Sequence, residues 1–315
     1  MQMASNDSVF KVLSLDGGGS KGVYSLGVLK EMERHVGSPL SKYFSLVYGT
    51  STGSIIAALI ALGWKIDDIY DLYLEHIPKI MGQKSSHCKS KQLERCTNEV
   101  FGDKRFESFS ESTMIGIVAL NFDKQRPTIF KSSTLQMFDK NYNKKGVVPG
   151  FGCMISDAVQ ASCSAYPIFE KKRIYPINMD SFEAVDGGFI ANDPSFYALN
   201  DAENVLGDEI KRLRILSVGT GIYDYKSIGF KDRLFKRFNI YSFVEKIIRS
   251  SSNTNQQLMK IIYPKIHVIR VEDKYEGENF KTNMVEKNIK KLKKMNNDGR
   301  GSFKKMSKEI LDGMI

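Results

Sequence analysis

The stretch LSLDGGGSKG, residues 13–22, places three consecutive glycines between a short apolar run and a helix-like segment. A glycine-rich turn that opens a helix points unpaired backbone N–H groups at any negative charge above it. That charge belongs either to a nucleotide phosphate or to the oxyanion of a reaction whose nucleophile lies elsewhere in the chain. The surrounding sequence has to distinguish these two interpretations.

Strand-like and helix-like segments alternate around this turn. Residues 9–15 and 43–49 are short, rich in β-branched or aromatic side chains and bounded by glycine, which predicts two strands. Residues 23–36 show helical apolar spacing, and residues 54–64 form an apolar run too short to span a bilayer, so both predict helices. This order indicates parallel strands joined by crossover helices, and therefore an α/β fold.

The pattern continues along the chain with one interruption. Residues 67–81 predict an amphipathic helix, whereas residues 82–121 lose the periodicity and are interpreted as a mobile flap or an insertion. Regular patterns then return in PTIFKSS, in a helix over residues 155–164, in EAVDGG, in LRILSVGTG at residues 213–221 and in KIHVIRV. Two basic helical segments are predicted near the end.

Composition limits the partners and the compartment. The formal charge of +10, from 46 Lys and Arg against 36 Asp and Glu, favours contact with an anionic lipid surface or a nucleotide. The N-terminus lacks the basic start and long apolar segment of a secretory signal, so a cytoplasmic location is predicted. The four cysteines lack the spacing typical of a zinc site and indicate free thiols. No metal or other cofactor is expected.

GTSTG, residues 49–53, fits the pattern G-x-S-x-G with Ser51 at its centre. Gly49 and Gly53 suit a sharp turn, because a Cβ at either position would crowd the backbone and block access to the hydroxyl. The motif follows a predicted strand and opens an apolar helix, as a nucleophile elbow requires. For the pentapeptide alone, a tight turn without chemistry remains the alternative.

A serine nucleophile also needs a site for the oxyanion. Gly17, Gly18 and Gly19 can direct consecutive N–H groups at a carbonyl oxygen as it gains charge, and the following helix dipole adds a favourable field. Lys21 either adds positive potential or faces solvent. The stretch does not fit the phosphate loop G-x-x-x-x-G-K-[ST] and fits G-x-G-x-x-G only in part, so the oxyanion interpretation is favoured.

Two candidates exist for the base. The order Ser51, Asp186, His267 matches an α/β-hydrolase triad, but His267 lies inside a predicted strand, and the elbow follows only two predicted strands. Asp186 ends a predicted strand, and Gly187 and Gly188 let the backbone turn away from its carboxylate. A carboxylate shielded from water can serve as the general base, although Asp-Gly is also a common turn. The sequence therefore predicts a Ser51–Asp186 dyad.

The three motifs D-G-G-G-x-[KR]-G, G-x-S-x-G and D-G-G occur here in that order, at residues 16–22, 49–53 and 186–188. In this the chain resembles the patatin-like phospholipases; ASCSAYPIF and SVGTG are also similar to family segments. The resemblance implies a three-layer α/β fold with a central, mostly parallel sheet flanked by helices. It implies a catalytic domain over residues 9–221 and a basic α/β extension, residues 222–315, packed on it.

The resemblance also implies a mechanism and a substrate. Ser51 would attack an ester carbonyl of a membrane phospholipid, Asp186 would act as the base, and the amides of Gly17, Gly18 and Gly19 would hold the oxyanion before water releases the fatty acid. Lys21 stands where the family often has Arg. A constitutive lysophospholipase or esterase with a Ser51–Asp186–His267 triad, and a non-catalytic nucleotide-binding regulator, remain open.

Within the family, VLSLDGGGSKGVYSLGVLKEME and GTSTGSIIAALIALG look most like the bacterial phospholipases of cyclic-oligonucleotide-based anti-phage defence. That resemblance implies activation by a cyclic dinucleotide such as cyclic GMP–AMP and action at the inner face of the host membrane. The nucleotide site is expected after Gly82 or beyond Gly221, since a generic acyl hydrolase does not need those segments. No DNA or RNA polymer is expected as a partner, and a homo-oligomer is left open.

The C-terminus is strongly basic, with nine Lys or Arg between residues 287 and 308. Val285, Ile289 and Leu292 form an apolar stripe, so the segment predicts a basic amphipathic helix that either lies on anionic lipid or packs on the core. A last helix is predicted to dock through its apolar side. Its docking residues are Phe303, Met306, Ile310 and Met314.

Overall fold

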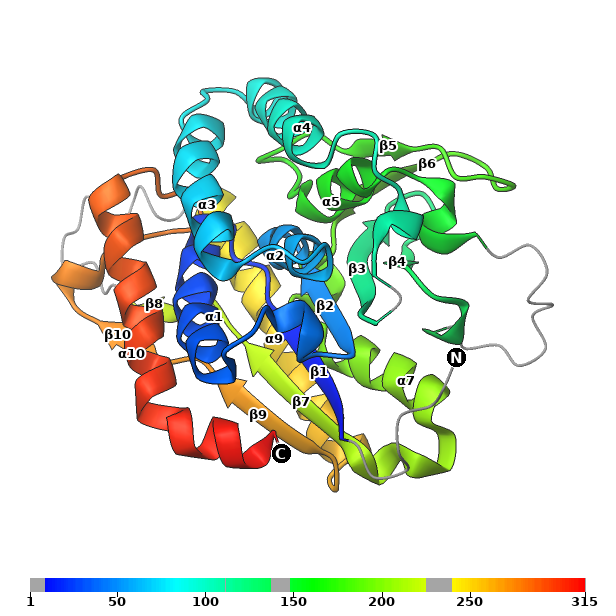
Figure 1. The fold of residues 1–315 in the computed structure, drawn as a ribbon. Coiled ribbons are helices and arrows are strands. Elements are labelled where there is room, and N and C mark those ends of the chain that lie inside the picture. Colours follow the sequence, from blue (N-terminus) through cyan, green and yellow to red (C-terminus); the bar gives the residue numbers. More distant parts are fainter. Residues whose placement is uncertain (1–8, 111, 137–147, 225–239, 315) are drawn as a thin grey trace.

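The computed structural model describes residues 9–110, 112–136, 148–224 and 240–314 (Figure 1). The first eight residues, on which the prediction about targeting rests in part, lie outside the described residues. Within the described part, one sheet has the strand order β5-β6-β3-β2-β1-β7-β9, and β4 pairs with β3 beside this path. Its strands are β1 (Phe10–Leu15), β2 (Leu46–Thr50), β3 (Met114–Asn121), β4 (Arg126–Lys131), β5 (Lys172–Ile174), β6 (Phe182–Asp186), β7 (Leu213–Val218) and β9 (His267–Val271).

Helices cover both faces of this sheet, and a two-stranded sheet of β8 (Ile222–Asp224) and β10 (Lys274–Glu276) lies beside it (Figure 1). The helices are α1 (Gly22–Val36), α2 (Thr52–Ala61), α3 (Ile66–Met81), α4 (Ser86–Phe101), α5 (Ile155–Cys163), α6 (Gly188–Ala191), α7 (Ser195–Leu206), α9 (Ile240–Ile262) and α10 (Ile289–Gly313). All pairings from β3 through β2, β1 and β7 to β9 are parallel, whereas β4, β5 and β6 pair antiparallel.

The alternation of side chains along β1 divides the core in two. Leu13 and Leu15 point into a cluster with the apolar faces of α1, α2, α3 and α10. Val12 points to the opposite face, where it packs with residues of α7 and with Met259 of α9. These layers confirm the predicted three-layer α/β fold with a central, mostly parallel sheet.

The interpretation of residues 82–121 as a flap or an insertion is wrong. This stretch contains α4 and the central strand β3. The buried face of α4 includes Lys89 and Thr97 beside Leu93, so its hydropathy pattern is weak although its burial is helical. β3 is buried on both faces and therefore lacks the alternation that marks a half-exposed strand.

The C-terminal region joins the same sheet, because β9 extends it next to β7. The two basic helical segments predicted near the end are one helix, α10, which continues through Gly299 and Gly301. A Cβ at Gly299 would lie 2.0 Å from the carbonyl oxygen of Tyr24, so the glycine allows α10 to pack closely on α1. The helix α9 was not predicted.

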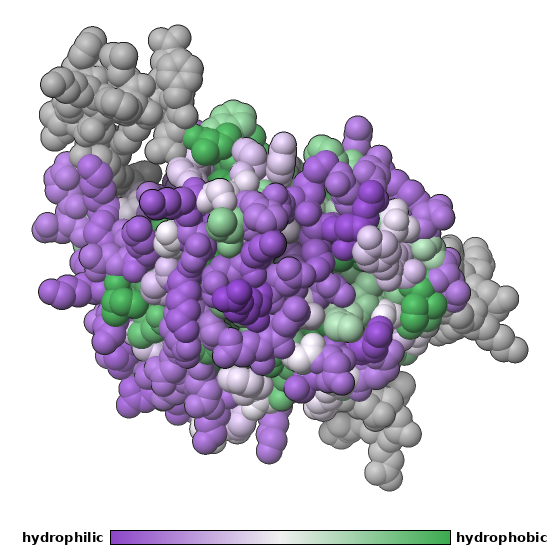
Figure 2. Space-filling view, turned by 90° about the horizontal axis from the view of Figure 1, so that it is seen from above, coloured by the Kyte–Doolittle hydropathy of each residue, from purple (hydrophilic) through white to green (hydrophobic). Residues whose placement is uncertain are grey.

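The surface seen from above the view of Figure 1 is mostly hydrophilic, with small separate hydrophobic groups (Figure 2). The apolar run at residues 54–64 lies largely in α2, so the prediction of a helix is confirmed, and all residues of α2 are buried. Among the helices of the described residues, none combines the length and the apolar character that crossing a bilayer requires.

Candidate active site

Ser51 occupies the turn between β2 and α2. Its φ of 52° lies in the left-handed region, which a non-glycine residue adopts only when its surroundings enforce it. A Cβ at Gly49 or at Gly53 would lie 2.3 Å from a backbone carbonyl oxygen, so both positions exclude a side chain. The strand–turn–helix geometry is that of a nucleophile elbow, and it presents Oγ at the carboxyl edge of the sheet.

The side chain of Asp186 meets Ser51 across the sheet. Ser51 Oγ donates a hydrogen bond to Asp186 Oδ2 at 2.7 Å, and the N–H of Gly188 donates to Oδ1 at 2.7 Å. Asp186 is the last residue of β6, which pairs with β3, while β3 pairs with β2, the strand that precedes Ser51. The structure therefore brings together two predicted residues that lie 135 positions apart in the chain.

The environment of this carboxylate suits a base. Asp186 is buried, and loss of water around it raises its pKa to about 7, although the hydrogen bonds from Ser51 and Gly188 act in the opposite direction. A pKa near neutrality lets a carboxylate accept a proton from a hydroxyl and return it later. The N–H of Ser51 itself donates to Ser162 Oγ at 2.8 Å, which holds the elbow from α5.

The amides of the glycine loop are not equivalent. The N–H of Gly17 donates to the carbonyl oxygen of Asn192 at 3.2 Å and is therefore occupied. The N–H groups of Gly18 and Gly19 have no acceptor within the described part of the chain. Gly19 also lines the pocket that contains Ser51, so its amide is the best-placed donor for an oxyanion there.

A C-terminal segment lies directly on this loop. The N–H of Ser20 donates to the carbonyl oxygen of Met284 at 2.9 Å, and a Cβ at Gly19 would lie 2.1 Å from that oxygen. Gly19 has a φ of +58°, so glycine is favoured there by both conformation and contact. Val285, the next residue, lines the Ser51 pocket. Residues from the end of the chain therefore close one side of the site.

Lys21 and Gly187, two further residues predicted from the sequence, do not line the Ser51 pocket but stabilise the segments around it. Lys21 is buried and forms an ion pair with Glu245 of α9, so it does not face solvent. A Cβ at Gly187 would lie 2.3 Å from the carbonyl oxygen of Val118, which shows how closely the turn after β6 approaches β3.

The walls above Ser51 are apolar. The pocket there is lined by side chains of α2, α3, α4 and α5 and by Met284 and Val285. It shares four residues with a second pocket between α3 and α4 that has no polar surface. The shared residues are Ile55, Ile77, Ile80 and Leu93. Both pockets are mainly apolar, and these four side chains form a wall that the two pockets share.

The alternative triad is not assembled. His267 is the first residue of β9 and pairs in register with Arg214, at the amino edge of the parallel strands. Ser51 follows the carboxyl end of β2, at the opposite edge. The structure does not bring His267 to Ser51, because residues at opposite ends of parallel strands are separated by the length of those strands.

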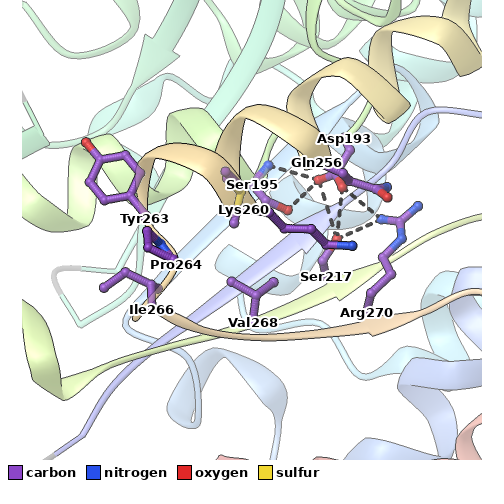
Figure 3. A pocket seen from close by; sticks show the side chains of 11 residues that line it. Asp193, Ser195, Ser217, Gln256, Lys260, Tyr263, Pro264, Ile266, Val268 and Arg270 are labelled. Carbon is purple, nitrogen blue, oxygen red and sulfur yellow. Dashed lines mark hydrogen bonds and ion pairs between the residues drawn. The ribbon is translucent and has the colours of Figure 1, made fainter.

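Another pocket of the described residues does not contain Ser51 or Asp186. It has a volume of about 330 Å³ and lies between α9, β9 and the start of α7 (Figure 3). None of its residues was predicted individually, although those from Gln256 to Arg270 lie in the region beyond Gly221 where a nucleotide site was expected.

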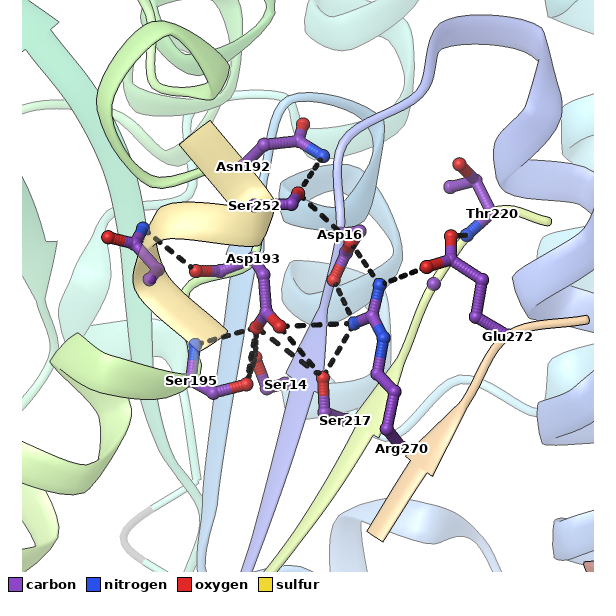
Figure 4. A network of polar contacts seen from close by, with 12 residues as sticks. Ser14, Asp16, Asn192, Asp193, Ser195, Ser217, Thr220, Ser252, Arg270 and Glu272 are labelled. Atoms are coloured by element: carbon purple, nitrogen blue, oxygen red, sulfur yellow. Dashed lines mark hydrogen bonds and ion pairs between the residues drawn. The ribbon is translucent and has the colours of Figure 1, made fainter. Parts of the chain in front are cut away.

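A network of buried charges connects this pocket with the glycine loop (Figure 4). Arg270 of β9 donates from Nη1 and Nη2 to the two oxygens of Asp16, each at 2.7 Å, and also pairs with Glu272 at 2.8 Å and Asp193 at 3.3 Å. Asp16 is the residue immediately before Gly17. The sequence offered one signal for this clamp of Arg270 on Asp16, an arginine between two apolar residues in the strand segment KIHVIRV, but no indication of its partners.

Comparison with known proteins places these observations in context. The family model for patatin-like phospholipases matches residues 13–199. A cUMP-AMP-activated phospholipase of Escherichia coli is 42% identical over 311 residues, which cover 98% of this chain and 95% of that protein. A cGAMP-activated phospholipase of Vibrio cholerae is 24% identical, over 79% of this chain and 75% of that protein. The structure of human GIVD cytosolic phospholipase A2 aligns with a TM-score of 0.48 and 9% identity, over 100% of this chain and 63% of that one.

Proposed function

The chain belongs to the patatin-like phospholipase family, and we propose that it hydrolyses fatty-acyl esters of membrane phospholipids with Ser51 as nucleophile and Asp186 as general base. The observation that carries the assignment of residues is the 2.7 Å hydrogen bond from Ser51 Oγ to Asp186 Oδ2 at an apolar pocket. A serine and a carboxylate in direct contact satisfy the first requirement of nucleophilic catalysis without a histidine.

In the first half-reaction, Ser51 Oγ bonds to the ester carbonyl carbon while its proton passes to Asp186 Oδ2. The carbonyl oxygen becomes an oxyanion, and the free N–H groups of Gly18 and Gly19 are the donors for it. When the tetrahedral intermediate collapses, the bond to the leaving alkoxide breaks, and that oxygen takes the proton from Asp186. The products are the lysophospholipid and an acyl ester on Ser51.

In the second half-reaction, water replaces the alcohol. Asp186 accepts a proton from the water as its oxygen attacks the acyl carbon, and the same two amides hold the second oxyanion. Collapse releases the fatty acid and returns the proton to Ser51 Oγ. The pKa of Asp186, about 7, suits both directions of transfer near neutral pH.

The surroundings of Ser51 support a fatty acyl chain as the bound group. Ile55, Ile77 and Leu93 give the walls of the two pockets beside Ser51 a mainly apolar surface. Burial of methylene groups there would contribute about 0.8 kcal/mol each. A polar acyl group would lose its hydration without compensation.

Exposed aromatic side chains near the pocket support action at a lipid surface. Tyr166 and Phe122 are 49% and 45% exposed, and Lys171 Nζ lies 5.9 and 4.4 Å from their ring centroids. Tyr166 follows Ala165, which lines the Ser51 pocket. Aromatic rings beside a lysine suit the boundary between acyl chains and anionic headgroups.

We also propose that a cyclic dinucleotide activates the enzyme, as the names of the two bacterial relatives state for those proteins. The contact of the Met284 segment with the glycine loop is consistent with a site whose access and oxyanion donors depend on a remote segment.

Substitution of the dyad tests the chemistry. Ser51→Ala and Asp186→Asn should each lower fatty-acid release from phosphatidylglycerol vesicles by at least about 10³-fold, since removal of one member of a catalytic unit has effects of this order. His267→Ala serves as the control and should retain activity. Near-normal release by folded Ser51→Ala or Asp186→Asn protein would refute the dyad, and loss of activity in His267→Ala would restore the triad.

An assay of the unmodified protein with cyclic UMP–AMP or cyclic GMP–AMP tests activation separately. Faster fatty-acid release with one of them supports the regulatory proposal. Equal release with and without both would point to a constitutive lipase, and nucleotide binding without any hydrolysis would point to a non-catalytic regulator.

A further inference from the structure

The pocket between α9 and β9 is lined by two kinds of surface, which lie at different ends (Figure 3). Tyr263, Pro264 and Ile266 form an apolar, partly aromatic end. Asp193, Ser217 and Arg270 form a polar end, and the side chain of Lys260 extends across the space between them. Pockets for small ligands combine apolar walls with a few directed polar groups in this way.

Apart from the amide oxygen of Gln256, the polar groups that remain without a partner in this pocket are donors. The oxygens of Asp193 already accept hydrogen bonds from Ser14, Ser195, Ser217 and Arg270, so they are not free for a ligand. Lys260 Nζ and the side chain of Gln256 have no partner within the part of the chain that the structure describes. Arg270 Nε, in the pocket wall, is buried and has no acceptor there either. An occupant that brings acceptors and negative charge matches this set.

Three connections lead from the pocket to the glycine loop. Arg270, in the pocket wall, holds Asp16 through two hydrogen bonds of 2.7 Å (Figure 4). Asp193, in the pocket floor, follows Asn192, whose carbonyl oxygen accepts the N–H of Gly17. The third connection is α9, which lines the pocket with Gln256 and Lys260 and reaches the loop through Glu245.

A serine on α9 strengthens the same link. Ser252 Oγ accepts a hydrogen bond from Asn192 Nδ2 at 2.9 Å and lies 3.5 Å from Asp16 Oδ2. A shift of α9 or Arg270 would therefore move Asp16, which precedes Gly17, and a shift of α9 would also move Asn192, which accepts the N–H of Gly17. Such a shift would reposition the amides of Gly18 and Gly19, which the proposed mechanism uses.

We infer that the α9–β9 pocket is the regulatory site for the activating nucleotide. One base stacks on the apolar end of the pocket at Tyr263, and a phosphate accepts hydrogen bonds from Lys260 Nζ and Arg270 Nε. A volume of about 330 Å³ is at the lower end of the range for ligand pockets, so one nucleotide enters and the second lies at the open mouth. Arg270 transmits occupancy to Asp16 and the oxyanion loop. This inference rests on the proposed nucleotide activation and adds its site and its route.

Two pairs of exposed-residue variants test the site. Lys260→Ala removes the phosphate partner, and Lys246→Ala, an exposed lysine earlier on α9, is the matched control. Val268→Trp fills the pocket from an exposed strand position, and Ile261→Trp, exposed and outside the pocket, is its control. Affinity for cyclic UMP–AMP and cyclic GMP–AMP is measured by calorimetry, and activation is measured on lipid vesicles.

Lys260→Ala should weaken the binding of the activating nucleotide by about tenfold to a hundredfold, the usual loss for one charge-assisted contact. Val268→Trp should abolish detectable binding, and both controls should bind like the wild type. Wild-type affinity in Lys260→Ala and Val268→Trp would overturn the site. A wild-type protein that hydrolyses lipid but does not respond to either nucleotide would overturn the regulation itself, so the two failures are distinguishable.

The proposed coupling between the pocket and the oxyanion loop is tested in the reverse direction, from Ser51 to the nucleotide site. If occupancy of the pocket repositions the oxyanion loop, a fluorophosphonate that modifies Ser51 should change the nucleotide affinity by about fivefold or more, as coupling between two sites requires. Arg270→Lys keeps the positive charge but not the double hydrogen bond, so it should bind the nucleotide and lose most of the activation. Unchanged affinity after modification of Ser51, or full activation of Arg270→Lys, would overturn the route.

Discussion

The glycine loop is held in different ways on its two sides. On the Ser51 side, the contacts are short-range packing at glycines and hydrogen bonds of the elbow and of β6. On the opposite side, β9 and α9 hold the loop through ion pairs that Arg270 and Glu245 form with the buried residues Asp16 and Lys21. The contacts of the elbow and of β6 lie within residues 13–199, which the family model matches, whereas Arg270, Glu245 and the Met284 segment that packs on Gly19 lie beyond them. The machinery for the reaction and the clamp that positions it thus come from different parts of the chain.

The charged side should dominate stability. Arg270→Met leaves Asp16, Asp193 and Glu272 without their guanidinium partner, so the free energy of unfolding should fall by about 3–5 kcal/mol. Arg173→Met is the control, because Arg173 is 49% exposed and 3.9 Å from Asp123, and it should cost less than about 1 kcal/mol. Urea denaturation measures both; equal losses would show that the clamp is not a buried charge cluster in solution.

The Ser51 side should dominate catalysis. Gly19→Ala places a methyl group 2.1 Å from the Met284 carbonyl oxygen, so the loop must move and kcat should fall by about 10²–10³-fold, the usual effect of losing an oxyanion donor. Gly37→Ala is the control, because Gly37 also has a positive φ, +70°, but has open space around it. A similar loss of kcat in both variants would mean that backbone strain, and not the loop contact, is responsible.

An intermediate effect is expected where the two sides meet. Glu245→Gln leaves the buried ammonium group of Lys21 without its anionic partner beside the loop. The free energy of unfolding should fall by about 1–3 kcal/mol, and kcat should fall with it because Lys21 leads into α1. Lys79→Met, which breaks an exposed pair with Glu75, is the control for both measurements. If Glu245→Gln behaves like that control, α9 does not hold the loop.

The smallest effect is expected in the pH dependence of kcat/KM, which depends on the Ser51 side alone. Because Asp186 must be ionised to accept a proton and its pKa is about 7, kcat/KM should fall about tenfold per pH unit below that value. The same raised pKa means that the folded state holds this proton more tightly than the unfolded chain, so the contribution of Asp186 to stability declines from about pH 4 to pH 7. Asp186→Asn should lack that decline. A flat kcat/KM profile from pH 5 to 7 would argue against Asp186 as the base.

The candidate site was largely predictable because its motifs describe local backbone requirements. Ser51 needs a sharp turn with glycine on both sides, and Asp186 needs a strand end followed by glycines, so each leaves a recognisable pattern. The sequence could not predict which of the amides of Gly17, Gly18 and Gly19 are free, because that depends on which of them lies near the carbonyl oxygen of Asn192. The same applies to Ser162, which holds the elbow but has no motif of its own.

The errors in the fold have related physical causes. The helix α4 was missed because its buried face includes Lys89, whose burial depends on a neighbouring carbonyl oxygen, that of Gln83. The helix α10 was divided in two because glycines normally weaken a helix, whereas Gly299 is required by the close approach to α1. Tertiary contacts override local propensity in both cases.

The sequence by itself determined the α/β class, the parallel strands, the elbow at Ser51 and its acidic partner, because periodicity and glycine motifs are local consequences of backbone geometry. Only the tertiary structure decided which amides stay free, that His267 lies at the wrong edge of the sheet, and that Arg270 holds the loop through Asp16 from 254 residues away. Contacts between distant segments depend on the register and order of the strands, and those are settled when the chain packs, not by the neighbours of a residue in sequence.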